Sequence, residues 1–153
     1  MSDVKSRLAE LGIELPPVAT PAGAYVPALQ SGSLVYTSGQ LPLVGGKLRR
    51  TGKVGAEVSA EDAYDDARQC AINALAAIDD LVGLDKVVRV VKVVGFVASD
   101  PSFTGQPKVI NGASELLGEV FGDAGAHARS AVGVAVLPID TPVEVEVVVE
   151  VSA

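Results

Sequence analysis

The residue whose type and position most strongly suggest chemistry is Arg129, which lies among small and apolar residues in the segment His127–Pro138. An unpaired buried cation is strongly destabilising, so this guanidinium must either reach solvent or meet an anion. A planar guanidinium binds a planar carboxylate through two parallel hydrogen bonds. The segment therefore indicates a site for a small carboxylate or, as the alternative, a structural ion pair with Glu144 or with a carboxylate of a neighbouring subunit.

Glu144 is the acidic residue that we expect near this arginine. It opens the segment Val143–Val151, in which every odd position is valine and Glu144, Glu146 and Glu150 share the even face with Val148. The preceding apolar segment, Ala131–Leu137, and the Pro138–Pro142 turn predict a hairpin whose strand ends bring Arg129 and Glu144 near each other. A carboxylate can orient water and accept a proton, whereas Glu146 and Glu150 are interpreted as solvated.

Two helices are predicted to position these strands. One is capped by Ser59, carries a mostly alanine stripe suited to close packing on a sheet, and ends at Gly83; the other runs from Pro107 to Gly122. Further strands are expected at Tyr25–Leu29, Leu34–Ser38 and Val87–Val97. The order predicts one α+β domain over residues 1–153, with a mixed sheet and both main helices on one face. Residues 1–17 form an N-terminal extension, a short helix at Asp3–Leu11 followed by an extended segment.

The composition argues against several classes of protein. The net charge of −7 opposes binding to nucleic acid, and the pair Arg49-Arg50 is interpreted as a solvated turn rather than a basic patch. One His and one Cys are too few for a metal site, and Cys70 lies on the alanine stripe, where a buried thiol is a small hydrophobe. With neither a membrane span nor a secretory signal predicted, a cytoplasmic location is expected.

The faces of Val87–Val97 and Ala131–Leu137 away from the helices are expected to remain largely apolar. Contiguous apolar surface of this kind indicates a partner, and self-association with closed symmetry is the simplest one. Any pocket would then lie where subunits meet, and Arg129 could be shielded there.

At this point the sequence resembles the Rid, or reactive intermediate deaminase, family of YjgF-type proteins. The resemblance runs from about residue 25 to residue 151 and rests on several separated motifs in order: Gly23-Ala24-Tyr25-Val26, Tyr36-Thr37-Ser38-Gly39-Gln40-Leu41-Pro42, Asn111, Ala128-Arg129-Ser130, Leu137-Pro138 and Glu144-Val145-Glu146. It implies a chorismate-mutase-like fold, a homotrimer, and an active site in each cleft between subunits.

The implied reaction is hydrolysis of an enamine or imine derived from an amino acid, such as 2-aminoacrylate or 2-iminobutanoate, to ammonia and a 2-oxo acid without a cofactor or metal. Arg129 would hold the substrate carboxylate and Glu144 would position water. The substrate-binding positions would be Tyr25, Ser38, Gly39, Asn111 and Ala131. Ala131 stands where many members carry Cys and Gly133 where many carry a charged residue, so this chain resembles a divergent subgroup.

Other interpretations remain open from the sequence. The cleft could bind a 2-oxo or amino acid without turning it over, although retention of Glu144 beside a carboxylate receptor favours catalysis. Nuclease activity is disfavoured by the acidic charge, and chorismate mutase activity would rest on fold resemblance alone. The resemblance does not ask for a catalytic histidine, so His127 is given no role.

Overall fold

The computed structural model describes residues 3–21 and 23–153 of the chain. Besides three short 3₁₀ turns, the regular elements are α1 (Val4–Glu10), β1 (Ala28–Ser31), β2 (Leu34–Thr37), α2 (Ala60–Leu81), β3 (Val87–Ala98), α3 (Gln106–Phe121), β4 (Ala128–Val134) and β5 (Val143–Val151).

The five strands form one mixed sheet in the order β1-β2-β5-β3-β4. Only β3 and β4 are parallel; the other neighbours pair antiparallel. The predicted hairpin between the last two strands is therefore wrong, because β3 lies between β4 and β5. The reason is the helix α3, which crosses over between β3 and β4 and leads the chain back parallel to β3.

The predicted bounds of two strands also shift. The strand expected at residues 131–137 is β4, Ala128–Val134, because its pairing with β3 begins at Ala128. Arg129 therefore lies inside the strand rather than before it. At the other end of the chain, β1 begins at Ala28, three residues later than expected, and Tyr25 lies in the preceding loop.

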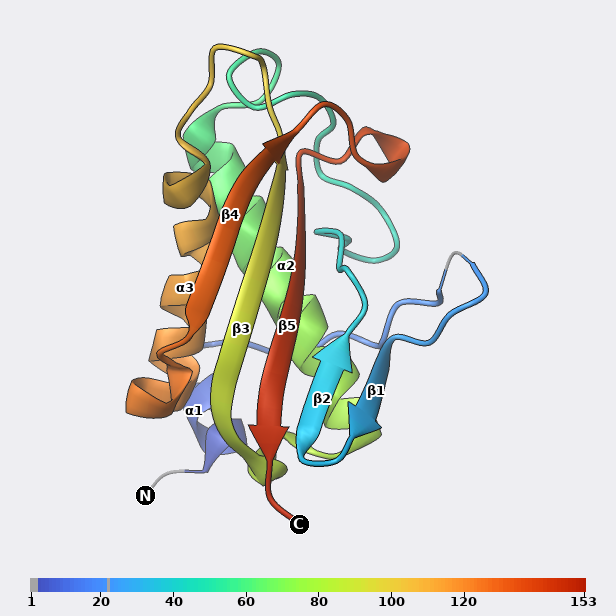
Figure 1. Cartoon of the computed structure of the whole chain (residues 1–153), viewed down its shortest axis with the longest axis vertical. Helices are drawn as coiled ribbons and strands as arrows, with labels where there is room; N and C mark the ends of the chain where they lie inside the picture. The colour runs from blue at the N-terminus through green and yellow to red at the C-terminus, as the bar shows by residue number, and fades with distance from the viewer. Residues whose placement is uncertain (1–2, 22) are drawn as a thin grey trace.

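The helices α2 and α3 pack on one face of the sheet, as predicted, and Figure 1 shows both behind the strands. The core lies between these layers and contains the odd-numbered valines of β5, from Val143 to Val151, and the alanine stripe of α2. Ser59 caps α2 by accepting a hydrogen bond from the Asp62 amide at 3.1 Å. The two helices approach so closely that a Cβ at Gly112 would overlap the Tyr64 carbonyl.

The other face of the sheet, the open face, has no helix over it among the described residues. Alternation along β5 turns Glu144, Glu146 and Glu150 to this face, opposite the buried valines. Leu29, Tyr36 and Val132 are exposed. The open face thus combines apolar side chains, such as Val132 on β4, with the carboxylates of β5.

The segments outside the sheet are anchored by ion pairs and hydrogen bonds. The pair Arg49-Arg50, interpreted from sequence as a solvated turn, instead holds Asp66 of α2, with Nη1 of Arg50 donating to Oδ1 at 2.7 Å. On α1, Nε of Arg7 donates to the Glu119 carbonyl near the end of α3. No helix in the described part of the chain is long and apolar enough to cross a membrane.

Candidate functional site

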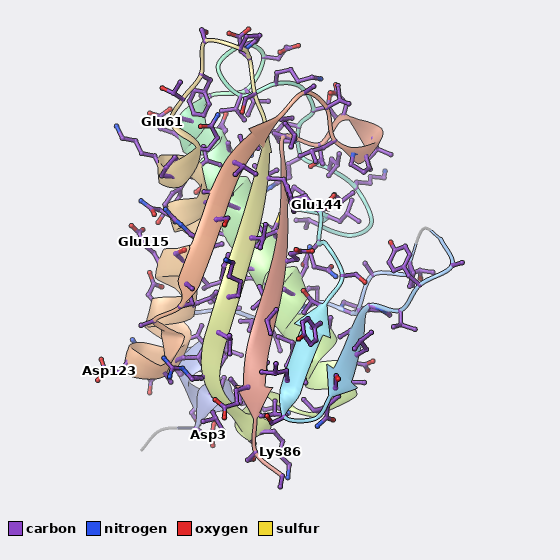
Figure 2. All side chains as sticks on the ribbon, in the orientation of Figure 1. Asp3, Glu61, Lys86, Glu115, Asp123 and Glu144 are labelled. Carbon is purple, nitrogen blue, oxygen red and sulfur yellow. The ribbon has the colours of Figure 1, made fainter. Side chains whose placement is uncertain are left out.

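A cavity of about 470 Å³ lies at the start of β5 on the open face, and we call it the Glu144 pocket. Its lining residues are Tyr25, Ser38, Gly39, Leu41, Pro138 and Glu144. Four of the predicted site residues, from three separate stretches of sequence, thus surround one space. Figure 2 shows Glu144 close to the loop that follows β2.

Backbone pairing beyond the end of β2 brings Gly39 against Glu144. The Gln40 amide donates to the Val145 carbonyl at 2.8 Å, and the Val145 amide donates back at 3.0 Å. A Cβ at position 39 would overlap Oε2 of Glu144 and lie 2.9 Å from its Cδ. Glycine is required here for close approach, because any side chain would displace the carboxylate.

The electrostatics of the pocket favour a carboxyl group that can exchange a proton. Burial, and secondly the negative charge of Glu146, raise the pKa of Glu144 above its usual value. A raised pKa makes a carboxylate a stronger base at neutral pH, provided that the group remains largely ionised. No cation pairs with Glu144 among the described residues.

Ser38 and Gly39 offer polar groups to the same space. The Ser38 hydroxyl donates to the Val26 carbonyl at 2.6 Å, which leaves its oxygen able to accept. The Ser38 and Gln40 amides both donate to backbone carbonyls. The Gly39 amide between them makes no hydrogen bond within the described residues.

A second group of polar residues, the Arg129 cluster, comprises Arg129, Asn111, Ser114 and His127. From β4, Nη1 of Arg129 donates to Oδ1 of Asn111 at 2.8 Å and to Oγ of Ser114 at 3.2 Å, both on α3. His127 contacts Ser114 through Nε2 at 2.8 Å and the Gly125 carbonyl through Nδ1 at 2.6 Å. Ala131 follows Arg129 on the same face of β4.

Arg129 and Glu144, which we expected to lie close together, are far apart within the chain. Arg129 on β4 pairs with Val93 of β3, and Glu144 on β5 pairs with Phe96 of β3. The strands β4 and β5 lie on opposite sides of β3. Three residues along a strand and two strand spacings each amount to about 10 Å. Val93 and Phe96 also point to opposite faces. The expectation that Arg129 and Glu144 lie near each other in one chain is wrong, and so is an ion pair between them within it.

The predicted residues therefore divide into two sets. Tyr25, Ser38 and Gly39 lie with Glu144, whereas Asn111 and Ala131 lie with Arg129. Asn111, a predicted substrate-binding residue, accepts a hydrogen bond from the guanidinium through its side-chain oxygen.

Sequence reasoning missed Ser114 altogether and gave His127 no role. The spacing of Asn111 and Ser114, three residues apart on a helix, places both on one side and was the available signal. Cys70 is fully buried, and burial raises the pKa of its thiol, so it is unsuited to act as a nucleophile. Within the described ranges, no three His, Cys, Asp or Glu side chains are grouped to hold a metal ion.

Comparison with known proteins agrees with this arrangement of elements. The family described as "YjgF/chorismate_mutase-like, putative endoribonuclease" matches residues 5–151. Protein TCP17 of Trypanosoma cruzi is 46% identical, covering 97% of this chain and 94% of that protein. The 2-iminobutanoate/2-iminopropanoate deaminase of Salmonella typhimurium is 36% identical, covering 82% of this chain and 86% of that enzyme.

Among solved structures, the protein Atu1372 of Agrobacterium tumefaciens, of unknown function, is 46% identical with a TM-score of 0.90. The match covers 97% of this chain and 92% of that one. On the extent of the family match and on these identities, the chain belongs to the YjgF/chorismate-mutase-like family.

Proposed function

We propose that this protein hydrolyses reactive 2-imino acids and their enamine tautomers to 2-oxo acids and ammonia. In this proposal the protein is a homotrimer, and the Arg129 cluster of one subunit faces the Glu144 pocket of the next. The observation that carries the proposal is the division of the site residues into two incomplete halves. The Salmonella relative, whose name states this activity, supports the choice of substrate class.

The position of the Arg129 cluster supports a site shared between subunits. β4 is an edge strand, with β3 on one side and no strand on the other among the described residues. An edge strand can be approached by a second copy of the chain, and a neighbouring subunit would shield its unpaired backbone groups. A cleft formed there would surround the guanidinium with protein on both sides.

Each half of the site would have a distinct task. The guanidinium of Arg129 would bind the substrate carboxylate and fix the orientation of the adjacent imine carbon. On the other side of the cleft, Glu144 would hold a water molecule. The free Gly39 amide and the Ser38 oxygen would contact the polar groups of the substrate.

The reaction needs only proton transfers and the addition of water. An enamine first takes a proton from solvent on carbon and becomes the iminium ion, which is the protonated imine. The water oxygen then bonds to the iminium carbon while a water proton passes to Glu144, which gives a neutral carbinolamine. Glu144 returns that proton to nitrogen, the carbon–nitrogen bond breaks, and the hydroxyl proton passes to the Glu144 carboxylate and then to solvent, so that ammonia and a 2-oxo acid are released. A carboxylate with a raised pKa suits both steps, since it must accept and then donate the same proton.

The test generates 2-iminobutanoate in situ with an amino acid oxidase and follows its disappearance against the uncatalysed reaction in buffer. We expect the wild-type chain to accelerate hydrolysis, and we expect Arg129→Ala and Glu144→Gln to lose most of that acceleration. A wild-type rate equal to that in buffer would refute the proposal. If 2-oxobutanoate nevertheless bound in an Arg129-dependent way, the protein would be a sensor of small acids rather than an enzyme.

A further inference from the structure

A continuous chain of hydrogen bonds, which we call the relay, links Gly125, His127, Ser114, Arg129 and Asn111. Every donor in the relay has an acceptor. The Gly125 carbonyl can only accept, so Nδ1 of His127 carries the hydrogen and donates it at 2.6 Å. In the neutral imidazole, Nε2 is then an acceptor. The guanidinium can only donate, so Ser114 accepts from Arg129 and gives its own hydroxyl hydrogen to Nε2 of His127. For a neutral imidazole, the direction of every bond in this relay is thereby determined.

The relay also determines which edge of the guanidinium is left for a ligand. Nη1 carries two hydrogens, and Asn111 and Ser114 use both. No hydrogen bond reaches Nε or Nη2 within the described residues. These two nitrogens lie on the same side of the guanidinium and form an edge that matches the two oxygens of a carboxylate.

We infer that Ser114 and His127 are positioning residues that hold Arg129 with its Nε–Nη2 edge presented to the substrate carboxylate. This inference rests on the proposed function for the identity of the ligand. The physical reason is that an unrestrained arginine side chain loses much rotamer freedom on binding, whereas one already held by Asn111 and Ser114 loses little. His127 acts one step further away, because it fixes the orientation of the Ser114 hydroxyl.

The inference predicts a specific kinetic defect. A lost hydrogen bond to a charged group corresponds to about a tenfold change in an equilibrium constant. Ser114→Ala should therefore raise KM about tenfold with a smaller change in kcat, because carboxylate binding precedes the chemical step. His127→Leu should do the same, since Ser114 would then be free to rotate away.

Conservative variants separate positioning from mere structural damage. Ser114→Thr keeps the hydroxyl, and His127→Gln keeps an acceptor within reach of it, so both should retain a KM close to that of the wild type. Because the relay acts as a unit, the double variant Ser114→Ala/His127→Leu should have a KM no higher than that of either single variant. Ser102→Ala, in an exposed turn, is the matched serine control and should leave both constants unchanged.

The outcomes distinguish this inference from the proposed function. Wild-type turnover with an unaltered KM in Ser114→Ala would overturn the inference and leave the deaminase proposal intact. An equal defect in Ser114→Ala and Ser114→Thr would also overturn it. If the wild type showed no turnover, calorimetric titration with 2-oxobutanoate would decide the matter: a Kd weakened about tenfold in Ser114→Ala supports the relay, and an unchanged Kd or no binding to the wild type overturns it.

Discussion

Mixing two inactive variants tests directly whether the site is shared between subunits. Arg129→Ala keeps a complete Glu144 pocket, and Glu144→Gln keeps a complete Arg129 cluster. Within one chain the two residues are separated by β3 and point to opposite faces of the sheet. The offset is about 10 Å along the strands and about 10 Å across them, which is too far for both to contact a small imino acid.

The expected recovery follows from counting clefts. In trimers reassembled at random from equal amounts of the two variants, a cleft is intact only when one neighbour supplies Arg129 and the other supplies Glu144. About a quarter of the clefts meet this condition, so we expect about a quarter of the wild-type rate from a mixture of two inactive proteins. A site contained in one chain would recover nothing.

The assay requires subunit exchange and a control for it. The variants are unfolded together in denaturant, refolded, and assayed on 2-iminobutanoate, with light scattering to establish the oligomeric state. Wild type mixed with the double variant Arg129→Ala/Glu144→Gln is the control: shared clefts predict about a quarter of the wild-type rate, and sites within single chains predict about half. A refolded trimer of the two single variants with no activity, beside an active wild-type control, would refute the reasoning.

Further predictions concern the pocket, the loop that precedes α2, and nucleic acid. The Glu146→Gln change removes a negative charge that raises the pKa of Glu144, so the acidic limb of the rate against pH should move to lower pH; an unmoved limb would mean that another group titrates. Gly39→Ala should lower kcat/KM on the order of 10²-fold while circular dichroism stays unchanged, because the new Cβ displaces the Glu144 carboxylate. Arg50→Ala should destabilise the fold by about 2 kcal/mol in urea denaturation, because it removes the nearer partner of the buried Asp66 carboxylate. Burial raises the pKa of Asp66, so this loss should shrink as the pH falls and the carboxyl takes up a proton. Despite the endoribonuclease in the family's description, the net charge of −7 leads us to expect no RNA cleavage in a gel assay at low salt, and salt-sensitive cleavage lost in Glu144→Gln would contradict this.

The sequence by itself was sufficient for the two main helices and for the last strand. The Ser59 cap, the alanine stripe of α2 and the glycine at the end of α3 determine the two helices, since capping and hydrophobic periodicity act between residues close in the chain. The valine at every odd position likewise predicts both ends of β5, Val143–Val151. The motifs around Ser38, Arg129 and Glu144 are also sufficient to indicate the family.

Only the tertiary structure decided which residues meet. Strand pairing joins segments far apart in the chain, and residue patterns within one strand do not specify its neighbours. The insertion of β3 between β4 and β5 is such a decision, and the register of both strands against β3 sends Arg129 and Glu144 to opposite faces. The contact of Ser114 with His127 is another, because it depends on how α3 packs beside the start of β4. One sheet order therefore divides the candidate site into two halves that a single chain cannot join.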